Sequence, residues 1–333
     1  MTTKEQVKEK LEDIIIPGSM RSLIKLNLLN DIRISNQTIE ITLASAALNP
    51  EVQKWLKDKI SDVVGELSEV NNTIVDFIEA KPKDINNIQN VIAVMSGKGG
   101  VGKSLITALL SIALCRQGKE IGILDADITG PSIPKMFGIT SIRPAGSNTG
   151  IIPVLSQTGI NIMSINLVLE HEDDAVIWRG PLIGKAIQQF WEEVVWGNLD
   201  YLIVDLPPGT ADAPLTVMQT LPISGVVMVF SPQELAAMVV RKAVKMTQQM
   251  NIPIIGVVEN MSYFTVPDTG KKIELFGKSK GDEMAKITGA PLLAQIPIDP
   301  QLAQLCDAGE IEKYNSDTFE ILSQNFAKTL PNK

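Results

Sequence analysis

The sequence has few residues of the kinds that crosslink a chain or hold a metal. Among 333 residues there are two cysteines, Cys115 and Cys306, and one histidine, His171. Two cysteines cannot build a disulfide framework. Together with a single histidine they give one chain too few ligands for a conventional zinc or iron–sulfur site. The composition therefore excludes a disulfide-rich protein and argues against a metal centre of this kind built by one chain alone.

Long apolar runs and basic clusters are also missing. No apolar run reaches the roughly 18 residues of a membrane-spanning helix, and the first residues lack the apolar core of a secretory signal, so we expect a cytoplasmic protein. The net charge of −8 argues against a broad nucleic-acid footprint, which needs clustered lysine and arginine. No basic amphipathic helix at the carboxyl end suggests membrane binding. We therefore expect neither nucleic acid nor membrane as a partner.

The hydrophobic pattern of the sequence changes along the chain and predicts two domains. Residues 1–80 predict a small α/β domain, because Thr38–Leu43 alternates like a half-buried strand and Asn49–Pro50 supplies a helix cap followed by a first-turn proline. The polar segment 81–89 predicts a linker. Residues 90–333 predict an α/β domain with a mostly parallel sheet, because short apolar runs alternate with helical patterns. These runs are Val91–Met95, Ile121–Leu124, Tyr201–Val204, Val226–Phe230, Ile254–Val258 and Leu292–Ile296.

A glycine-rich loop follows the first of these runs. Gly97–Ser104 fits the pattern G-x-x-x-x-G-K-[ST] between the strand Val91–Met95 and the helix Leu105–Gln117, which is the context that this phosphate-binding pattern requires. Inward backbone N–H groups and the helix terminus would bind phosphates. We expect Lys103 to reach the β- and γ-phosphates of ATP and the Ser104 hydroxyl to ligate Mg²⁺. The predicted nucleotide-binding residues are Gly97, Lys98, Gly99, Gly100, Val101, Gly102, Lys103 and Ser104.

Carboxylates follow two other predicted strands. Asp125 and Asp127 follow the apolar strand that closes at Leu124, and Asp205 follows Tyr201–Val204. Because ligands of open α/β sheets bind at the carboxyl ends of strands, we expect Asp125 and Asp205 to support Mg²⁺. An alternative interpretation is that Asp125 and Asp127 only cap the following turn.

The glycine-rich loop contains a second lysine, Lys98, which is typical of one family of ATPases. With Lys98 before the usual Lys103, Gly97–Ser104 resembles the deviant Walker A motif of the MinD/ParA-like ATPases. The resemblance implies an ATP-sandwich homodimer in which Lys98 reaches the partner's phosphates. It also implies that Asp127 positions the attacking water. No arginine finger is evident near these motifs, so transition-state charge would fall to Lys98, Lys103 and Mg²⁺, and we expect slow hydrolysis.

Later segments extend the same resemblance. Gly256–Ser262 is similar to the family's adenine-binding segment, which implies that Asn260 bonds the base. Ile296–Asp299 is similar to the second wall of the base pocket and includes Pro297. Four further stretches resemble the Mrp-type (ApbC-like) iron–sulfur cluster carriers over residues 88–310, and residues 1–80 resemble the assembly-type domain often fused in front of them. The stretches are Asp127–Ser132, Trp178–Pro181, Trp196–Tyr201 and Leu206–Asp212.

The sequence departs from these carriers at the cluster site. They usually place a Cys-x-x-Cys after the Met-Ser-Tyr-Phe stretch, where this chain has Val266 and Thr269. Neither side chain supplies a thiolate. The cysteine usual near Ala47–Asn49 is missing as well. Cys115 and Cys306 are more typical of small buried hydrophobic residues than of ligands, so the cluster ligands stay unassigned.

Three functions remain after this comparison of motifs. The resemblance favours an ATP-hydrolysing iron–sulfur cluster carrier or assembly factor, with assembly or apo client proteins as partners. The missing cysteines favour an ATPase scaffold or regulator that has lost cluster binding. A partition or positioning ATPase suits the loop but not the charge. In the amino-terminal domain, a further apolar group is either core or a client surface: Leu28, Leu29, Ile32 and Ile34.

Overall fold

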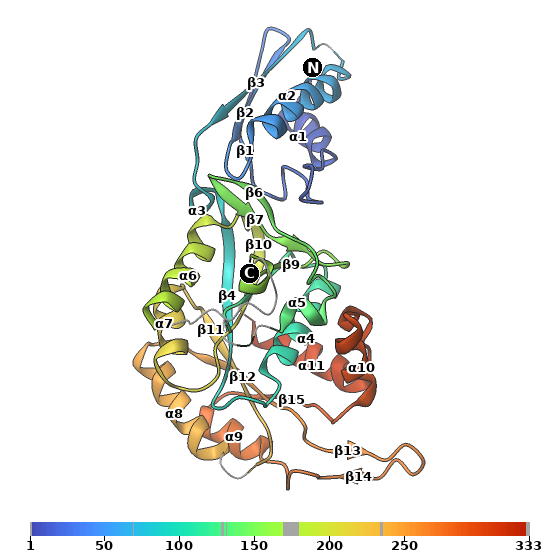
Figure 1. Ribbon diagram of the computed structural model, residues 1–333. Coiled ribbons are helices and arrows are strands. Elements are labelled where there is room, and N and C mark those ends of the chain that lie inside the picture. Colours follow the sequence, from blue (N-terminus) through green and yellow to red (C-terminus); the bar gives the residue numbers. More distant parts are fainter. Residues whose placement is uncertain are drawn as a thin grey trace. The chain divides into compact units, whose positions relative to one another are not determined.

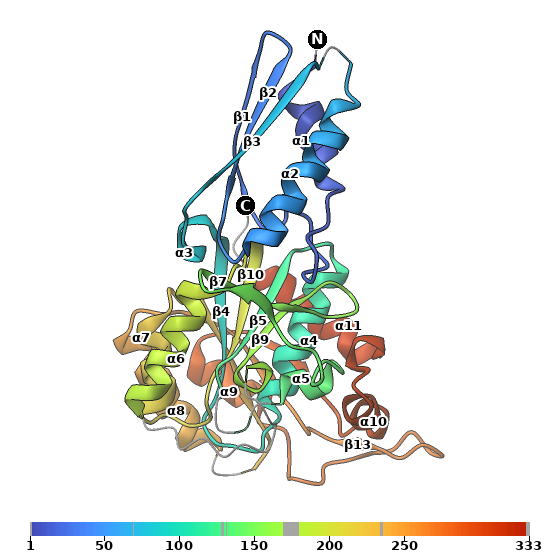
Figure 2. The same cartoon turned by 45° about the horizontal axis from the view of Figure 1, so that its top comes forward.

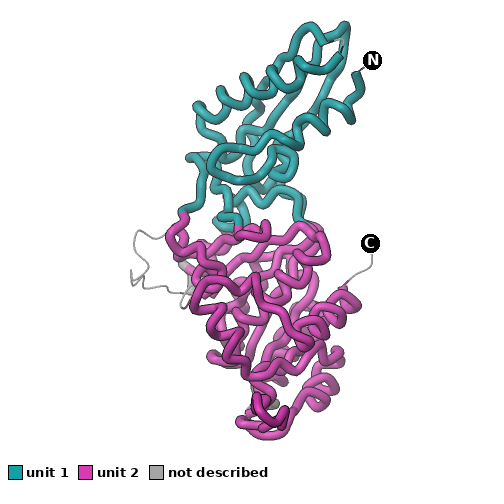
Figure 3. Tube along the Cα trace, turned by 90° about the vertical axis from the view of Figure 1, so that its right-hand side faces the viewer, with its two compact units in different colours: residues 1–88, 143–155, 189–199 teal, residues 89–142, 156–188, 200–333 magenta. Residues whose placement is uncertain are grey.

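The structure is a computed structural model that describes residues 2–68, 70–127, 130, 132–168, 180–233 and 236–330. Contacts divide the chain into two compact units, shown in teal and magenta in Figure 3. The first holds residues 1–88, 143–155 and 189–199, and the second holds residues 89–142, 156–188 and 200–333. Across the described ranges, no helix combines the length and the apolar character needed to cross a bilayer.

Unit 1 packs helices against one face of a small sheet with the order β1-β2-β3. Strands β1 and β2 are antiparallel, whereas β2 and β3 are parallel. A separate hairpin pairs β6 with β7. The elements are α1 (Lys4–Glu12), β1 (Leu29–Ser35), β2 (Thr38–Ala44), α2 (Pro50–Gly65), β3 (Asn72–Ile78), α3 (Pro82–Ile85), β6 (Ala145–Ser147) and β7 (Gly150–Ile152).

Local sequence explains where the two main helices of unit 1 begin. Thr3 and Gln6 form a capping box at the start of α1. The Asn49 side chain accepts from the Val52 N–H, and Pro50 occupies the first turn of α2. The helices bury apolar side chains against the alternating residues of β2. This core includes Val7, Leu11, Leu56, Ile60, Val64, Ile39, Ile41 and Leu43.

The four apolar residues left open by the sequence are divided between core and surface. Leu28 and Ile32 are buried, and Leu29 packs partly buried against the core of unit 1. Ile34 is 36% exposed. The group is therefore mainly core, which is the first of the two interpretations.

Two segments from later in the chain belong to unit 1. The buried Arg21 guanidinium donates to the Trp196 carbonyl at 3.0 Å. Gly197 has φ +68, and a Cβ there would lie 2.3 Å from the Lys25 carbonyl, so only glycine fits this approach. The Thr149 hydroxyl accepts from the Ala47 N–H. The segment predicted as a linker, 81–89, holds α3 and the start of the strand β4 (Asn87–Ser96). Whether 1–80 and 90–333 fold as separate domains stays a prediction.

A larger sheet, which lies mainly in unit 2, has the order β15-β12-β11-β4-β10-β5-β9-β8. Strand β11 pairs with β4 and β12, β12 pairs with β15, and β5 pairs with β9 and β10, all in parallel. The predicted α/β fold with a mostly parallel sheet is confirmed. The strands are β4 (Asn87–Ser96), β5 (Ile121–Asp125), β8 (Val154–Leu155), β9 (Asn161–Ser164), β10 (Asn198–Asp205), β11 (Gly225–Phe230), β12 (Ile254–Glu259) and β15 (Leu292–Gln295).

Helices cover both faces of this sheet. In Figures 1 and 2, α7 and α8 lie on one face, whereas α4 and α11 lie on the other. Every residue of β11 is buried, as expected for a strand covered on both sides. The helices are α4 (Lys103–Arg116), α5 (Ile133–Met136), α6 (Gly180–Glu193), α7 (Asp212–Thr220), α8 (Ala236–Gln249), α9 (Gly281–Thr288), α10 (Pro300–Ala308) and α11 (Asp317–Thr329), with short 3₁₀ turns at Ile165–Leu167 and Ile311–Lys313.

The topology determines where a ligand can bind. Strands β4, β10 and β5 are neighbours in the sheet. Because β10 and β5 are parallel, their carboxyl ends place Asp205 beside Asp125 at one edge. The glycine-rich loop leaves β4 and enters α4, and ligands of open α/β sheets bind at such strand ends.

Candidate nucleotide site

The glycine-rich loop has the backbone conformation that its glycines permit. Gly100 and Gly102 have φ +79 and +82, in the left-handed region that favours glycine. A Cβ added at Gly100 would meet no heavy atom within 4 Å, so the loop borders open space there. The Ser96 hydroxyl donates to the Lys98 carbonyl at 3.0 Å and fixes the start of the loop. The loop is therefore open to a ligand beside Gly100, and phosphate binding there stays a prediction.

Lys103 begins α4 and points its ammonium group at acidic side chains. It is 5% exposed. Its Nζ lies 2.7 Å from Asp205 Oδ1 and 3.5 Å from Asp127 Oδ2. A buried ammonium needs such partners because desolvation of an unpaired charge is costly. The structure thus brings together a predicted phosphate-binding lysine and two of the predicted carboxylates.

Asp205 ends β10 and is the centre of the hydrogen-bond network. Its side chain is fully buried. The Ser104 hydroxyl donates to Oδ2, and the Thr107 hydroxyl donates to Oδ1 at 2.8 Å. Thr107 also contacts the Lys103 carbonyl at 3.1 Å. One carboxylate is therefore oriented by two hydroxyls and one ammonium group, all from the first turns of α4.

Asp125 ends β5 beside Asp205. It is fully buried, and its oxygens accept from the Asp127 N–H and the Ser164 hydroxyl, both at 3.2 Å. Burial raises the pKa of Asp125 well above its usual value, and the neighbouring Asp205 carboxylate adds to this, whereas the Lys103 ammonium opposes it. Ser104, Asp125 and Asp205 supply hydroxyl and carboxylate oxygens, which is the ligand chemistry that Mg²⁺ prefers.

Asp127 is another carboxylate near the Lys103 ammonium group. Asp127 is 9% exposed, and its Oδ2 lies 3.5 Å from Lys103 Nζ. Its placement near that lysine is compatible with the predicted role beside the phosphates, which stays a prediction. Six residues of the predicted motifs and loops lie outside the described part of the chain: Ile128, Thr129, Pro131, His171, Trp178 and Arg179.

Lys98 takes a different direction from Lys103. It is half-buried, and its Nζ donates to the Gln233 side-chain oxygen, which follows β11. Lys98 therefore has a partner within its own chain. Its predicted action on a second copy stays a prediction.

Asn260 and Pro297 follow β12 and β15. Asn260 is 2% exposed, and its Nδ2 donates to the Val101 carbonyl at 2.9 Å. Its backbone N–H donates to the Phe230 carbonyl. Pro297 is half-buried, next to the buried Ile296. The base-binding roles of Asn260 and Pro297 stay predictions, and the contact of Asn260 with the glycine-rich loop is an additional finding.

The positions of the usual cluster cysteines lie on a short hairpin. Strands β13 (Phe264–Thr265) and β14 (Lys272–Ile273) are antiparallel, and the Val266 N–H donates to the Lys271 carbonyl. Val266 and Thr269 occur in its turn and offer no thiolate. In the described part of the chain, no group of three or more histidine, cysteine or acidic residues is arranged to hold a metal. An iron–sulfur cluster does not fit ligands from this chain alone.

Both cysteines are half-buried thiols. The Cys115 thiol donates to the Thr158 carbonyl at 3.4 Å, and burial raises its pKa. Cys306 lies on α10, where burial raises its pKa to about 11, with a smaller contribution from Asp307. Raised pKa values disfavour the thiolate that would ligate iron.

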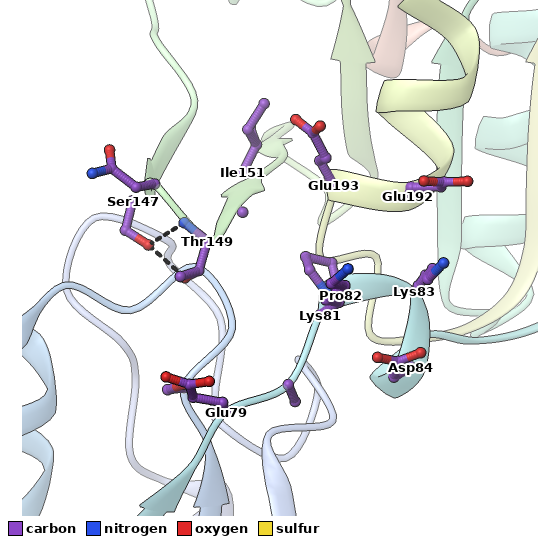
Figure 4. A pocket seen from close by; sticks show the side chains of 14 residues that line it. Glu79, Lys81, Pro82, Lys83, Asp84, Ser147, Thr149, Ile151, Glu192 and Glu193 are labelled. Carbon is purple, nitrogen blue, oxygen red and sulfur yellow. Dashed lines mark hydrogen bonds between the residues drawn. The ribbon is translucent and has the colours of Figure 1, made fainter. Parts of the chain in front are cut away.

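A separate cavity of about 650 Å³ lies within unit 1 (Figure 4). The hydroxyls of Ser147 and Thr149 lie 2.8 Å apart in its wall. The cavity holds no predicted site residue, and its charged lining groups carry both signs, so it indicates no ligand class. These groups are Glu79, Lys81, Lys83, Asp84, Glu192 and Glu193.

The sequence did not single out three residues of the nucleotide site. Thr107 lies one helical turn after Lys103, so helical spacing places both on one face of α4. Ser164 meets Asp125 because β9 pairs with β5 in register. Gln233 meets Lys98 from the segment after β11. A search for hydroxyls at i+4 from the loop lysine would have found Thr107, whereas Ser164 and Gln233 depend on tertiary pairing.

Comparisons with known proteins agree with this geometry. A family model described as a ParA-type NUBPL iron-transfer P-loop NTPase matches residues 87–330. The chain belongs to this family. Strands β4, β5 and β10 and helix α4, which carry the site, fall within the match, and the resemblance inferred from the motifs is confirmed.

Curated relatives share the name of one protein class. The chain is 45% identical over 235 residues to an iron-sulfur cluster carrier protein of Clostridium perfringens, a match that spans 68% of this chain and 82% of the relative. It is 36% identical over 329 residues to an iron-sulfur cluster carrier protein of Aquifex aeolicus, spanning 91% and 88%. The second match extends beyond the P-loop NTPase family region into unit 1.

Solved structures support the fold and nucleotide binding in a relative. A nucleotide-binding protein from Archaeoglobus fulgidus, solved with ADP, is 49% identical with a TM-score of 0.64, covering 70% of this chain and 91% of that one. A chain of the MinC:MinD cell division protein complex from Aquifex aeolicus matches with a TM-score of 0.51 at 19% identity. The match covers 73% of this chain and 98% of that one, and it shows the fold alone.

Proposed function

We propose that this chain binds ATP with Mg²⁺ and hydrolyses it slowly, as a nucleotide-gated homodimer that carries or assembles iron–sulfur clusters in the cytoplasm. The observation that carries the proposal is the convergence of Lys103, Ser104 and Asp205 at the open cradle of the glycine-rich loop. The ADP complex of the Archaeoglobus fulgidus relative supports nucleotide binding at the corresponding fold.

The residues of the loop would hold the phosphates, and Lys103 would exchange carboxylate partners for phosphate oxygens. Ser104, Asp125 and Asp205 would hold Mg²⁺, which supplies positive charge to offset that of the phosphates. Asp127 would orient a water molecule, because its carboxylate lies beside Lys103 at the same edge. Lys98 would act on the phosphates of a second copy after leaving Gln233.

Cluster work is proposed from the family and from the names of the relatives. The cluster is cargo rather than a resident group, and one chain supplies too few thiolates for it. Two copies of Cys306 would give two ligands, so further ligands would come from an assembly or client protein. In this arrangement the dimer would act as the gate. The assembly or client protein would supply part of the cluster-binding site.

The absence of cysteine at Val266 and Thr269 favours a second candidate, a nucleotide-gated scaffold or regulator that has lost cluster binding. The ATPase site is common to both candidates. They differ in the iron and sulfide that the dimer retains.

Anaerobic reconstitution of the purified full chain with iron and sulfide tests the proposal. The readouts are the visible spectrum and the iron and sulfide bound per dimer, compared with Cys306→Ser and with the matched half-buried variant Cys115→Ser. The carrier proposal expects a chromophore that Cys306→Ser removes and Cys115→Ser retains. A colourless wild-type protein with normal ATP turnover would overturn it in favour of the scaffold.

A further inference from the structure

Asn260 lies between two parts of the proposed nucleotide site. We propose that it is a positioning residue for the phosphate loop as well as a contact for the base, so that one amide couples recognition of adenine to the shape of the loop. This inference rests on the proposed ATP binding. It assigns Asn260 a role that exists before any nucleotide binds.

The contact with the loop is short and buried. Asn260 Nδ2 donates to the Val101 carbonyl at 2.9 Å, and the side chain is 2% exposed. A Cβ added at Gly102 would lie 2.1 Å from Nδ2 and 3.4 Å from Cγ. The amide therefore lies directly against the backbone of Gly102, the residue that precedes Lys103. It also donates a hydrogen bond to the carbonyl of Val101.

The backbone around Asn260 is also fixed in position. The Asn260 N–H donates to the Phe230 carbonyl at the end of β11. Met261, the next residue, has φ +57, a conformation that a non-glycine residue keeps only when its surroundings impose it. The buried Glu259 carboxylate accepts from the Ser262 and Ser279 hydroxyls at 2.6 and 2.7 Å and anchors this turn. Movement of Asn260 is restricted on both sides, so its amide can position the loop.

The chemistry of the amide allows both contacts at once. An asparagine side chain has two N–H donors and a carbonyl acceptor. The Val101 carbonyl can only accept, so it takes one N–H and fixes the orientation of the amide. The second N–H and Oδ1 form the donor–acceptor pair that matches N7 and the amino group of adenine. A guanine presents two acceptors on that edge, and turning the amide to suit it would put Oδ1 against the Val101 carbonyl.

A ligand without a base separates the two roles. A residue that only reads the base has no effect on tripolyphosphate, whereas a residue that shapes the loop affects it. We expect Asn260→Ala to weaken binding of tripolyphosphate, measured by calorimetry with Mg²⁺, by about fivefold, the effect of one net hydrogen bond. In the nucleotide-free protein, we expect faster amide hydrogen exchange over residues 99–103.

Two further variants make the experiment decisive. Asn161→Ala is the matched control, because Asn161 is also fully buried and its Nδ2 donates to a backbone carbonyl, that of Ile121, away from the loop. It should leave tripolyphosphate affinity and exchange of the loop unchanged. Asn260→Asp keeps the volume but replaces the donor with an acceptor, so it should reproduce both effects even if the alanine variant does not fold.

The outcomes distinguish the inference from the function on which it rests. Wild-type affinity for tripolyphosphate and wild-type exchange in both Asn260 variants, with only ATP affinity reduced, would overturn the bridging role. If the wild-type chain binds neither ATP nor tripolyphosphate, the proposed function fails. Hydrogen exchange of the nucleotide-free loop then still decides whether Asn260 positions it.

Discussion

Asp125 and Asp205 are register partners at the carboxyl ends of the adjacent parallel strands β5 and β10, and both carboxyl groups are fully buried. The Lys103 ammonium group lies 2.7 Å from Asp205. Parallel pairing thus places two acidic side chains together beside a buried cation.

Lys103→Ala removes the cation from this buried group. We expect ATP affinity to fall by at least about 30-fold, because a buried, hydrogen-bonded charge is lost. We also expect the free energy of unfolding of the nucleotide-free chain to fall by about 3 kcal/mol, since Asp205 loses its ionic partner. Calorimetry and urea unfolding measure the two effects. Lys286→Ala, on the exposed face of α9, is the control, and unchanged ATP binding in Lys103→Ala would refute the assignment of the loop.

Lys98→Ala tests action between subunits. Binding of ATP should change little, whereas hydrolysis should fall by about 100-fold, because a group that stabilises transition-state charge is lost. Mixing inactive Lys98→Ala with inactive Lys103→Ala should restore hydrolysis, since a mixed dimer regains one complete site. Phosphate release measures both. If Lys98→Ala retains wild-type hydrolysis, or if the mixture stays inactive, Lys98 does not act in trans.

Asp127→Ala should separate ATP binding from turnover. Removal of the carboxylate that orients water would leave Lys103 and the loop able to bind ATP, so the ATP-bound dimer should accumulate. Size-exclusion chromatography with light scattering should show a shift to the dimer with ATP but not with ADP. Asp282→Ala, in the first turn of α9, serves as the control. A variant that stays monomeric with ATP, or that hydrolyses it normally, would contradict the role.

Alkylation of Cys306 should depend on pH in a way that reports burial. Its pKa is raised to about 11 by burial, so the thiol stays protonated at neutral pH, and the rate with iodoacetamide should rise about tenfold per pH unit between pH 7 and 10. The pKa of the Cys306 thiol is higher in the folded chain than in the unfolded chain. The contribution of this thiol to the free energy of unfolding is therefore fully present below the unfolded-state pKa and is lost as the pH rises towards 11. Peptide mass spectrometry measures the rate, with urea-unfolded chain as the control. A plateau near pH 9 in the folded protein would contradict this account.

The parts of the site that the sequence predicted are those defined by short-range patterns. Glycine spacing between a strand and a helix identified the loop, and the strands that precede Asp125 and Asp205 placed these carboxylates at one edge. Their roles in chemistry stay predictions, but their proximity follows from parallel pairing. The local pattern was sufficient to predict that these carboxylates lie close together, because the strands are buried and parallel pairing sets their register.

The contacts that the sequence did not predict depend on pairing over long distances. Ser164 reaches Asp125 through the register of β9, and Asn260 reaches Val101 across 159 positions of the chain. Gly197 joins unit 1 because its backbone approaches Lys25 closely, which no local pattern indicates. Polar side chains and a single glycine carry too little periodic information to reveal such partners.

The central claim is that the edge formed by β4, β5 and β10 hydrolyses ATP with Mg²⁺, and phosphate release over a range of Mg²⁺ concentrations tests it most directly. The comparison is wild type against Asp205→Asn, which keeps the volume of the side chain and removes its charge. The account predicts slow release that stops when Mg²⁺ is chelated, and at least about tenfold slower release by Asp205→Asn, with a higher Mg²⁺ requirement. Absence of release by the wild type, or the same rate and Mg²⁺ dependence in both proteins, would contradict it.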